Sequence, residues 1–108
     1  MAGAEIVFTD STLALKGPMN FKTVTEIYVQ AEQALKDFSA HKSESKKLTI
    51  DCLSIVDADS SVISLLLALS RFAQNCSLSL DFVNLSEQMQ SLITLYELDW
   101  LLGAKKGA

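Results

Sequence analysis

The stretch that decides the fold is "LTIDCLSIVDADSSVISLLLAL", residues 48–69. Apolar and polar residues alternate over 47–55, and this two-residue period predicts a strand. Beyond the acidic segment "VDAD" (56–59), apolar residues recur every three or four positions. That spacing predicts a helix that begins at Ser60 or Ser61 and ends near residue 74. A strand followed directly by a helix is the unit from which parallel sheets are built.

The flanking sequence supplies more elements of both kinds. It predicts two short strands over 5–17 joined by the turn "TDST", a helix over 20–38 capped by Asn20, a loop over 39–47, a strand over 77–83 and a last helix capped by Ser86. The expected buried face of the last helix is Met89, Leu92, Ile93 and Tyr96, and "DWLLG" (99–103) is expected to add a short turn of helix or a stub of strand. The order β-β-α-β-α-β-α predicts an α/β fold. Its sheet is mostly parallel and mixed, with about four strands, an antiparallel first hairpin and flanking helices.

Size and charge narrow the class of the protein. A chain of 108 residues predicts a single domain over 1–108. The formal net charge of -4 and the pI of about 4.8 argue against a nucleic-acid partner, which calls for a basic surface, and against docking on anionic lipid. The densest apolar run, "VISLLLAL", is too short to cross a membrane, so we expect no direct membrane insertion.

Little in the sequence suits catalysis or metal binding. The one histidine is His41, the two cysteines form no CxxC motif, and no glycine-rich phosphate loop is present. Asp57 and Asp59 form an acidic pair, but no basic side chain lies near them in sequence, and acids before a helix commonly serve its positive end. We therefore expect no enzymatic activity and no cofactor. The alternative is a small enzyme that uses Asp57 or Asp59.

The beginning of the sequence, "MAGAEIVF", has neither the basic start nor the apolar core of a signal peptide. We therefore expect a cytoplasmic protein in a reducing compartment. Cys52 and Cys76 are expected to be free and buried thiols.

Ser60 stands where a parallel α/β unit usually places its sites, at the carboxyl end of a strand. One interpretation is purely structural: Ser60 or Asp59 is the N-cap of the helix, and the physics of the sequence favours it. The other is that a partner or a kinase recognises the hydroxyl. A phosphate on Ser60 would add about -2 charge at a helix N-terminus, which favours anions, and would disturb a contact there without unfolding the helix.

The helical wheel leaves a second face exposed. Six residues share the face expected to pack on the sheet: Val62, Leu65, Leu66, Leu69, Phe72 and Ala73. Ile63 and Leu67 fall outside it, and an expected surface strip is formed on their side of the helix by Ser60, Ile63, Ser64, Leu67, Arg71 and Gln74. Branched aliphatic side chains beside hydroxyls suit a protein–protein contact. The alternative is that the last helix covers Ile63 and Leu67.

The chain resembles the STAS domain family. This family includes the anti-sigma factor antagonists, the cytoplasmic tails of sulfate transporters, and the small STAS subunit of the Mla phospholipid-transport ABC system. The resemblance is carried by "LALKG" (13–17), by "LTIDCLSIVDADSSVISLLLAL" and by "LITLYELDWLL" (92–102). It implies a non-enzymatic role and partner binding through the start and exposed face of the second helix. The implied partner-binding residues are Asp59, Ser60, Ser61, Ile63, Ser64, Leu67 and Arg71, with Ser60 as the regulated hydroxyl. The family usually has Gly and then Leu where this chain has Val62 and Ile63, and glycine would allow a closer approach by a partner.

Within the family, "DSTLALKGPMN" (10–20) and the ending are similar to the Mla-type subunit. That resemblance implies a subunit that binds the ABC transporter ATPase, in complex with a membrane permease, at the inner face of the inner membrane. The alternative is an anti-sigma factor antagonist that an anti-sigma kinase switches by phosphorylating Ser60. A homodimer stays open, because exposed apolar residues also suit self-association.

Overall fold

The computed structural model describes residues 3–41 and 47–98, and the predicted order of elements is confirmed within them. The elements are β1 (Glu5–Thr9), β2 (Thr12–Pro18), α1 (Val24–His41), β3 (Lys47–Val56), α2 (Ser61–Asn75), β4 (Ser79–Val83) and α3 (Glu87–Leu95). The segment 99–103, for which the sequence predicts a turn of helix or a stub of strand, lies outside the described residues.

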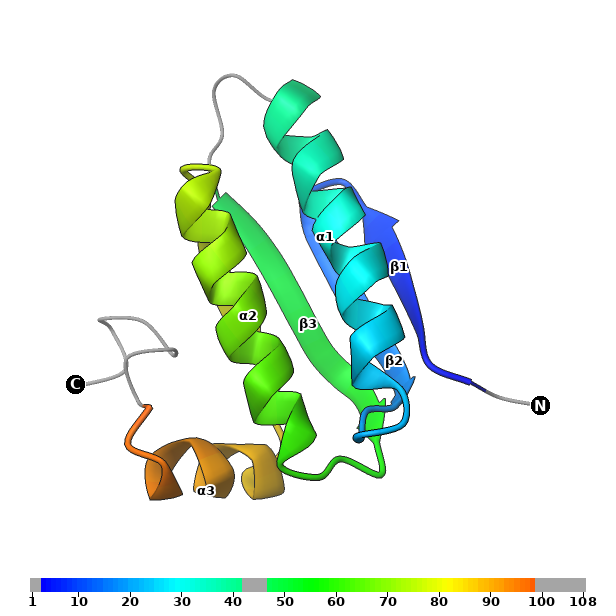
Figure 1. Cartoon of the computed structure of the whole chain (residues 1–108), viewed down its shortest axis with the longest axis vertical. Helices are drawn as coiled ribbons and strands as arrows, with labels where there is room; N and C mark the ends of the chain where they lie inside the picture. The colour runs from blue at the N-terminus through cyan, green and yellow to red at the C-terminus, as the bar shows by residue number, and fades with distance from the viewer. Residues whose placement is uncertain (1–2, 42–46, 99–108) are drawn as a thin grey trace.

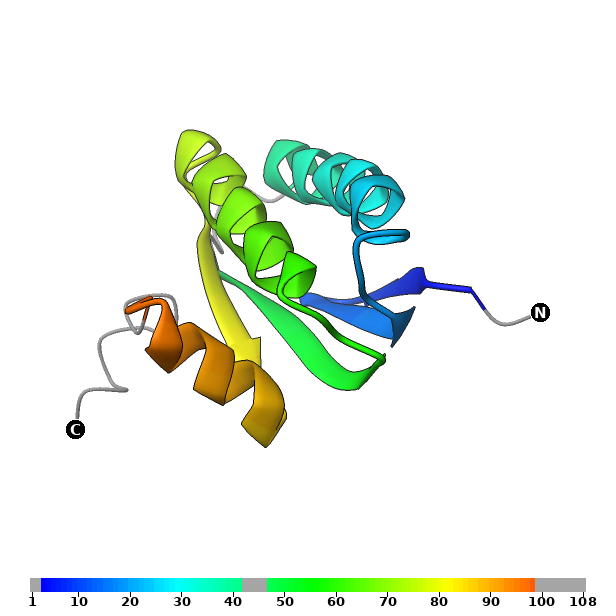
Figure 2. The ribbon, with the colours of Figure 1, turned by 60° about the horizontal axis from the view of Figure 1, so that its bottom comes forward.

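The four strands form one mixed sheet, as the sequence predicts, and their order in the sheet is β1-β2-β3-β4. β1 and β2 pair antiparallel across their short turn, whereas β2 with β3 and β3 with β4 are parallel. α1 and α2 lie side by side over one face of the sheet, and α3 lies crosswise near the start of α2 (Figures 1 and 2). The carboxyl ends of β2 and β3 therefore meet the starts of α1 and α2 at one end of the molecule.

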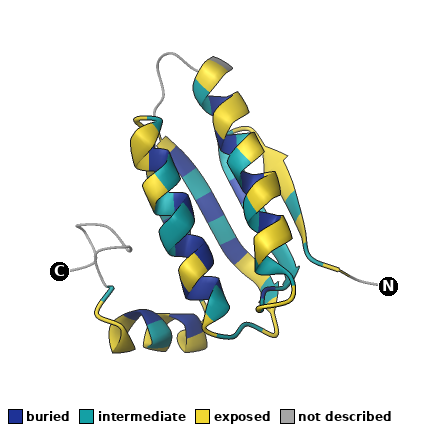
Figure 3. Cartoon of the chain, in the orientation of Figure 1, coloured by how far each residue is buried: buried dark blue, intermediate teal, exposed yellow. Residues whose placement is uncertain are grey.

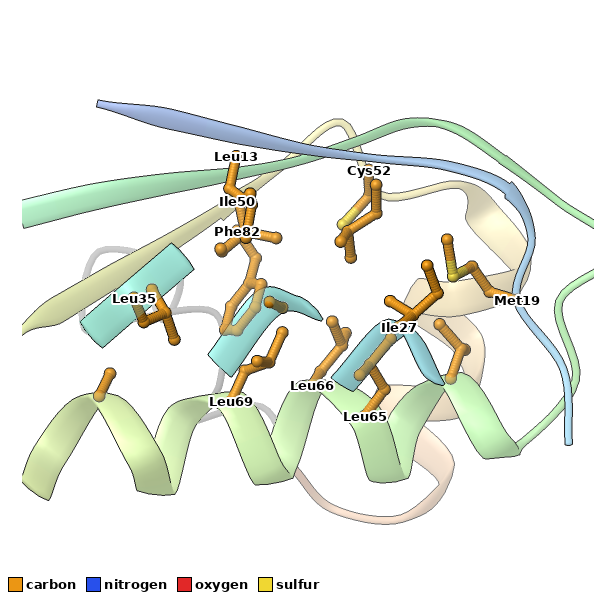
Figure 4. Close-up of a cluster of buried hydrophobic side chains, with 14 of the residues drawn as sticks. Leu13, Met19, Ile27, Leu35, Ile50, Cys52, Leu65, Leu66, Leu69 and Phe82 are labelled. Atoms are coloured by element: carbon orange, nitrogen blue, oxygen red, sulfur yellow. The ribbon is translucent and has the colours of Figure 1, made fainter. Parts of the chain in front are cut away.

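The core fills the space between the sheet and these two helices. Figure 4 shows Leu13, Ile50 and Phe82 pointing from the sheet toward Leu66 and Leu69 of α2. Buried residues run along β3 and along the helices that face it (Figure 3). Full burial of each such aliphatic side chain contributes roughly 1.5–3 kcal/mol, so this face of α2 fixes the helix on the sheet.

The start of α1 differs from the prediction, because the helix begins at Val24 rather than at Asn20. The Asn20 side chain accepts a hydrogen bond from the Lys22 backbone N–H at 3.0 Å, and the Thr23 hydroxyl accepts one from the Asn20 N–H at 3.0 Å. The Asn20 carbonyl also accepts the Val24 N–H at 3.0 Å. Asn20 therefore bonds to the backbone as an N-cap does, and residues 20–23 form a hydrogen-bonded turn that leads into α1.

The last helix follows the prediction at its start and departs from it at its end. Ser86 caps α3, since its hydroxyl accepts a hydrogen bond from the Met89 N–H at 3.1 Å. Met89 and Ile93 are buried and Leu92 is half-buried, as expected for the inner face. Tyr96, which the sequence places on that face, is instead 50% exposed, because α3 ends at Leu95 and Tyr96 follows as its C-cap.

Candidate partner-binding site

Two loops at the carboxyl end of the sheet are bonded to one another. The loop after β2 and the loop after β3 lie side by side, and the Met19 N–H donates to the Val56 carbonyl at 3.1 Å. In return, the Asp59 N–H donates to the Met19 carbonyl at 3.4 Å. Backbone bonds in both directions join the start of α2 to the turn that precedes α1. We call this region the Ser60 corner, defined as residues 19–23 and 56–61.

Asp59 is the residue that caps α2. One carboxylate oxygen, Oδ1, accepts a hydrogen bond from the Ser61 N–H at 2.8 Å, and the other, Oδ2, accepts one from the Phe21 N–H at 3.2 Å. Desolvation raises the pKa of this carboxyl, but the hydrogen bonds from Ser61 and Phe21 outweigh it and hold the pKa below its ordinary value. Asp59 is therefore ionised at neutral pH and is committed to two backbone donors.

Ser60 is left without the capping role. Its backbone is helical, with φ -64° and ψ -14°, and its side chain makes no capping hydrogen bond to α2. The side chain is exposed. Of the two capping residues that the sequence allows, the structure selects Asp59, so the Ser60 hydroxyl is accessible at the surface.

The first amides of α2 already have acceptors. The Ser61 N–H donates to the Asp59 carboxylate, the Val62 N–H to the Asp59 carbonyl at 3.0 Å, and the Ile63 N–H to the Ser60 carbonyl at 3.1 Å. A phosphate on Ser60 would thus meet donors that are in use. To gain the Ser61 amide, it would have to displace the Asp59 carboxylate.

The expected surface strip on α2 needs one correction. Ile63, which the sequence places outside the packed face, is only 3% exposed and belongs to the core. The wheel of an isolated helix does not include its neighbours, and here α3 and the residues after it lie against the start of α2. The alternative of a covering element is therefore right for Ile63, which cannot be a direct contact residue in this conformation.

The other predicted residues of α2 do reach the surface. Ser60, Ser64 and Arg71 are exposed, and Leu67 and Ser61 are half-buried. Ser60, Ser64, Leu67 and Arg71 follow helical spacing along one side of α2, and we call this row the α2 ridge.

A hollow lies on each side of the α2 ridge. One, of about 290 Å³, is lined within the described part of the chain by Ser60, Ile63, Ser64, Leu67, Tyr96 and Leu98. The other, of about 210 Å³, lies between the helices and is lined by Val24, Thr25, Tyr28, Ser64, Leu65 and Ala68. Ser64 borders both. A partner protein with a complementary groove can bind a convex helical ridge of this kind and place its side chains in the two shallow, mostly apolar hollows.

Phe21 is a candidate contact residue that the sequence interpretation missed. Its side chain is 70% exposed although its backbone is held by Asp59. The Lys22 ammonium lies 6.0 Å from the ring centroid. The sequence did contain a signal for Phe21: it is an aromatic residue in a polar segment, and it lies outside the apolar stripe of the helix that follows.

Other chemistry has little support in the described residues. Among the side chains that the structure describes, no three His, Cys, Asp or Glu come close enough to hold a metal ion. Cys52 and Cys76 are free, as predicted, but only Cys52 is fully buried. Desolvation, with a smaller effect of Asp51, raises the pKa of Cys52 to about 12, so this thiol stays protonated. None of the described helices has the length and apolar character of a membrane span.

Comparisons with known proteins bear on the family and the fold. A family model described as "Mlab, STAS domain" matches residues 3–103. Among solved structures, the chain is similar to the anti-sigma factor antagonist SpoIIAA in its unphosphorylated form, with a TM-score of 0.66 and 14% identity over 89% of this chain and 82% of that one. It is similar to part of SLC26A9, with a TM-score of 0.60 and 16% identity over 81% of this chain and 16% of that one. A third similarity, to part of Mglu, has a TM-score of 0.52 and 12% identity over 77% of this chain and 20% of that one. At these identities the solved structures show a shared fold. No curated protein matches the chain.

Proposed function

The chain belongs to the STAS domain family, and on this premise we propose that it is a non-enzymatic accessory subunit of an ABC-type phospholipid transporter. In this role it binds the cytoplasmic ATPase of the transporter, which is itself in complex with a membrane permease. Two findings support the Mla-type assignment: the matching family model is of the MlaB type, and it spans residues 3–103.

The observation that carries the proposal is the α2 ridge. Ser60, Ser64 and Arg71 are exposed in a row, with hollows on both sides of Ser64. A helix that presents such a row can lie in a groove of another protein, with partner side chains in the hollows. Asp59 and Ser61 contribute at the start of the ridge, whereas Ile63 supports it from below.

The proposed subunit acts through contact alone. The ATPase hydrolyses ATP and the permease complex moves lipid, while this chain stabilises or regulates the ATPase by occupying its surface. The protein is then held at the inner face of the inner membrane through its partners, and it needs neither a cofactor nor insertion into the bilayer.

A second candidate function is that of an anti-sigma factor antagonist, and the accessible hydroxyl of Ser60 favours it. In that role an anti-sigma kinase transfers the γ-phosphoryl group of ATP to Ser60 Oγ, which releases ADP while the hydroxyl proton passes to a base of the kinase. The added charge of about -2 beside Asp57 and Asp59 then weakens the contact. SpoIIAA, whose fold this chain shares, is itself an anti-sigma factor antagonist.

The two functions predict different partners. We would purify the tagged chain from its own cells in mild detergent and identify bound proteins by mass spectrometry. An ABC ATPase recovered with its permease supports the first function, provided that the purified ATPase then binds the purified chain. A soluble kinase-like protein, with phosphate on Ser60, supports the second. Recovery of a second copy of the chain alone, with a dimer mass by light scattering, contradicts both and indicates self-association.

A further inference from the structure

Phe21 combines an exposed aromatic side chain with a fixed backbone. Its side chain is 70% exposed, while its backbone is fixed by the Asp59 carboxylate at 3.2 Å. The turn that carries it is fixed as well, because the Thr23 hydroxyl donates to the Pro18 carbonyl at 2.7 Å. A large apolar side chain on an ordered turn loses little conformational entropy when a partner covers it. Aromatic residues, phenylalanine among them, are enriched in the cores of protein interfaces, and a few well-packed anchors carry most of the binding energy.

Phe21 is also continuous with the surface assigned to the partner. The carboxylate that accepts its N–H accepts the Ser61 N–H at 2.8 Å with its other oxygen. Ser60 lies between Asp59 and Ser61 in the sequence. The Asp59 side chain thus holds both the turn that carries Phe21 and the start of the α2 ridge. Asp57 is exposed on the same corner, and the Asn20 amide reaches its carbonyl at 3.5 Å.

We propose that Phe21 is an anchor of the docking surface, that an apolar pocket on the partner ATPase receives its ring, and that Asp59 is the positioning residue that holds it there. This inference rests on the proposed function, which supplies the partner. Two exposed charges flank this anchor within the Ser60 corner: the Lys22 ammonium lies 6.0 Å from the ring centroid, and Asp57 is exposed. They fit a partner pocket whose rim carries polar groups of both signs.

The shared carboxylate also links Ser60 to Phe21. A negative group on Ser60 repels the adjacent Asp59 carboxylate and competes with it for the Ser61 amide. As Asp59 moves away from the amide, the Phe21 N–H loses its acceptor and the turn loosens. A charge on Ser60 therefore weakens the contact at two places, at the ridge itself and at the aromatic anchor.

The link is tested first in the free protein, by amide hydrogen exchange measured with NMR. We expect exchange at the Phe21 amide to be severalfold faster in Asp59→Ala and faster in Ser60→Asp, with Asp59→Asn intermediate because the amide oxygen replaces only one of two acceptors. The control is the Met89 amide, which is held by Ser86 at the start of α3 and should not change. Unchanged exchange at Phe21 in Asp59→Ala overturns the link, whatever the partner.

The anchor is tested by the affinity of the purified ATPase for variants of the chain. We expect Phe21→Ala to weaken binding about tenfold or more, and Phe21→Leu to weaken it less. Leu53→Ala is the matched control: Leu53 is 71% exposed and lies on β3, outside the residues of the Ser60 corner and the α2 ridge, and its truncation should leave the affinity within about twofold. The double variant Asp59→Ala with Phe21→Ala should lose less than the product of the two single losses.

The outcomes separate this inference from the proposed function. If the wild-type chain binds the ATPase and Phe21→Ala binds equally well, the anchor is wrong and the function stands. If the two losses multiply in the double variant, Asp59 does not act through Phe21. If the wild-type chain does not bind the ATPase at all, the proposed function is wrong and the anchor falls with it, while the exchange experiment still decides the link.

Discussion

The helices α2 and α3 each begin after a serine, and the two serines do different work. Ser86 has an extended backbone, with ψ 163°, and its hydroxyl accepts the Met89 N–H. Ser60 has a helical backbone, with ψ -14°, and the helix it precedes is capped by Asp59 instead. Ser86 stabilises its helix as a cap, whereas Ser60 is exposed in the same corner as the exposed Phe21. A residue type at a helix start thus acquires its role from the conformation of the backbone.

The two helix starts are alike in that the third residue of each helix is buried. Truncating this residue in α2 should have the largest effect on stability. Ile63 of α2 and Met89 of α3 are both the third residue of their helix, and both are buried. Ile63→Ala should lower the free energy of unfolding by about 2–5 kcal/mol, because it leaves a cavity in the core. Chemical denaturation checks this, with Ser64→Ala as the exposed neighbour that should change little. A loss as small as that of Ser64→Ala would return Ile63 to the surface strip.

The serines themselves should differ in their effect on stability. Ser86→Ala removes a cap and should cost about 1 kcal/mol in the free energy of unfolding. Ser60→Ala removes no capping bond and should stay within about 0.5 kcal/mol of the wild type. The same denaturation measurement compares the two. Equal losses would mean that Ser60 also caps its helix in solution, and the contrast between the two starts would fail.

A smaller effect is the pH dependence of the stability that Asp59 provides as the cap of α2. The pKa of Asp59 is lowered from its ordinary value of 3.8 in the folded chain. The ionised carboxylate therefore stabilises the fold above that ordinary value, and this stabilisation is lost as the pH falls through the lower, folded pKa. The difference in Tm between wild type and Asp59→Asn should be present at pH 7. It should become smaller when the pH is lowered below 3.8, the ordinary pKa of the carboxyl. A difference that is constant with pH would show that the charge of Asp59 does not contribute.

The fold could be predicted from the sequence because it depends on periods within each element. The two-residue period of β3 and the helical period of α2 each identify their own element, and their order dictates a mostly parallel sheet. The start of α1 is predicted too early because residues 20–23 form a hydrogen-bonded turn before the helix, in which Asn20 and Thr23 bond to the nearby backbone. Such local bonding depends on side-chain conformation, which a hydrophobic pattern does not contain.

The candidate site could be predicted only in part, for a related reason. The wheel of α2 alone assigns Ser60, Ser64 and Arg71 to the surface, and they are exposed. The same wheel misplaces Ile63, because its cover comes from the region of α3, which is distant in the sequence. Phe21 escapes notice because its relation to Ser60 depends on Asp59, which joins loops after two different strands.

In our proposal the serine at the start of α2 is available to a partner, whereas the serine at the start of α3 is used as a cap. The most direct test adds the same charge to both starts and measures the affinity of the purified ATPase. Ser86→Asp is the control, because aspartate is itself a good N-cap and the site lies outside the Ser60 corner. We predict that Ser60→Asp weakens binding by about tenfold or more, while Ser86→Asp stays within about twofold of the wild type. Equal affinities for the two variants would contradict it.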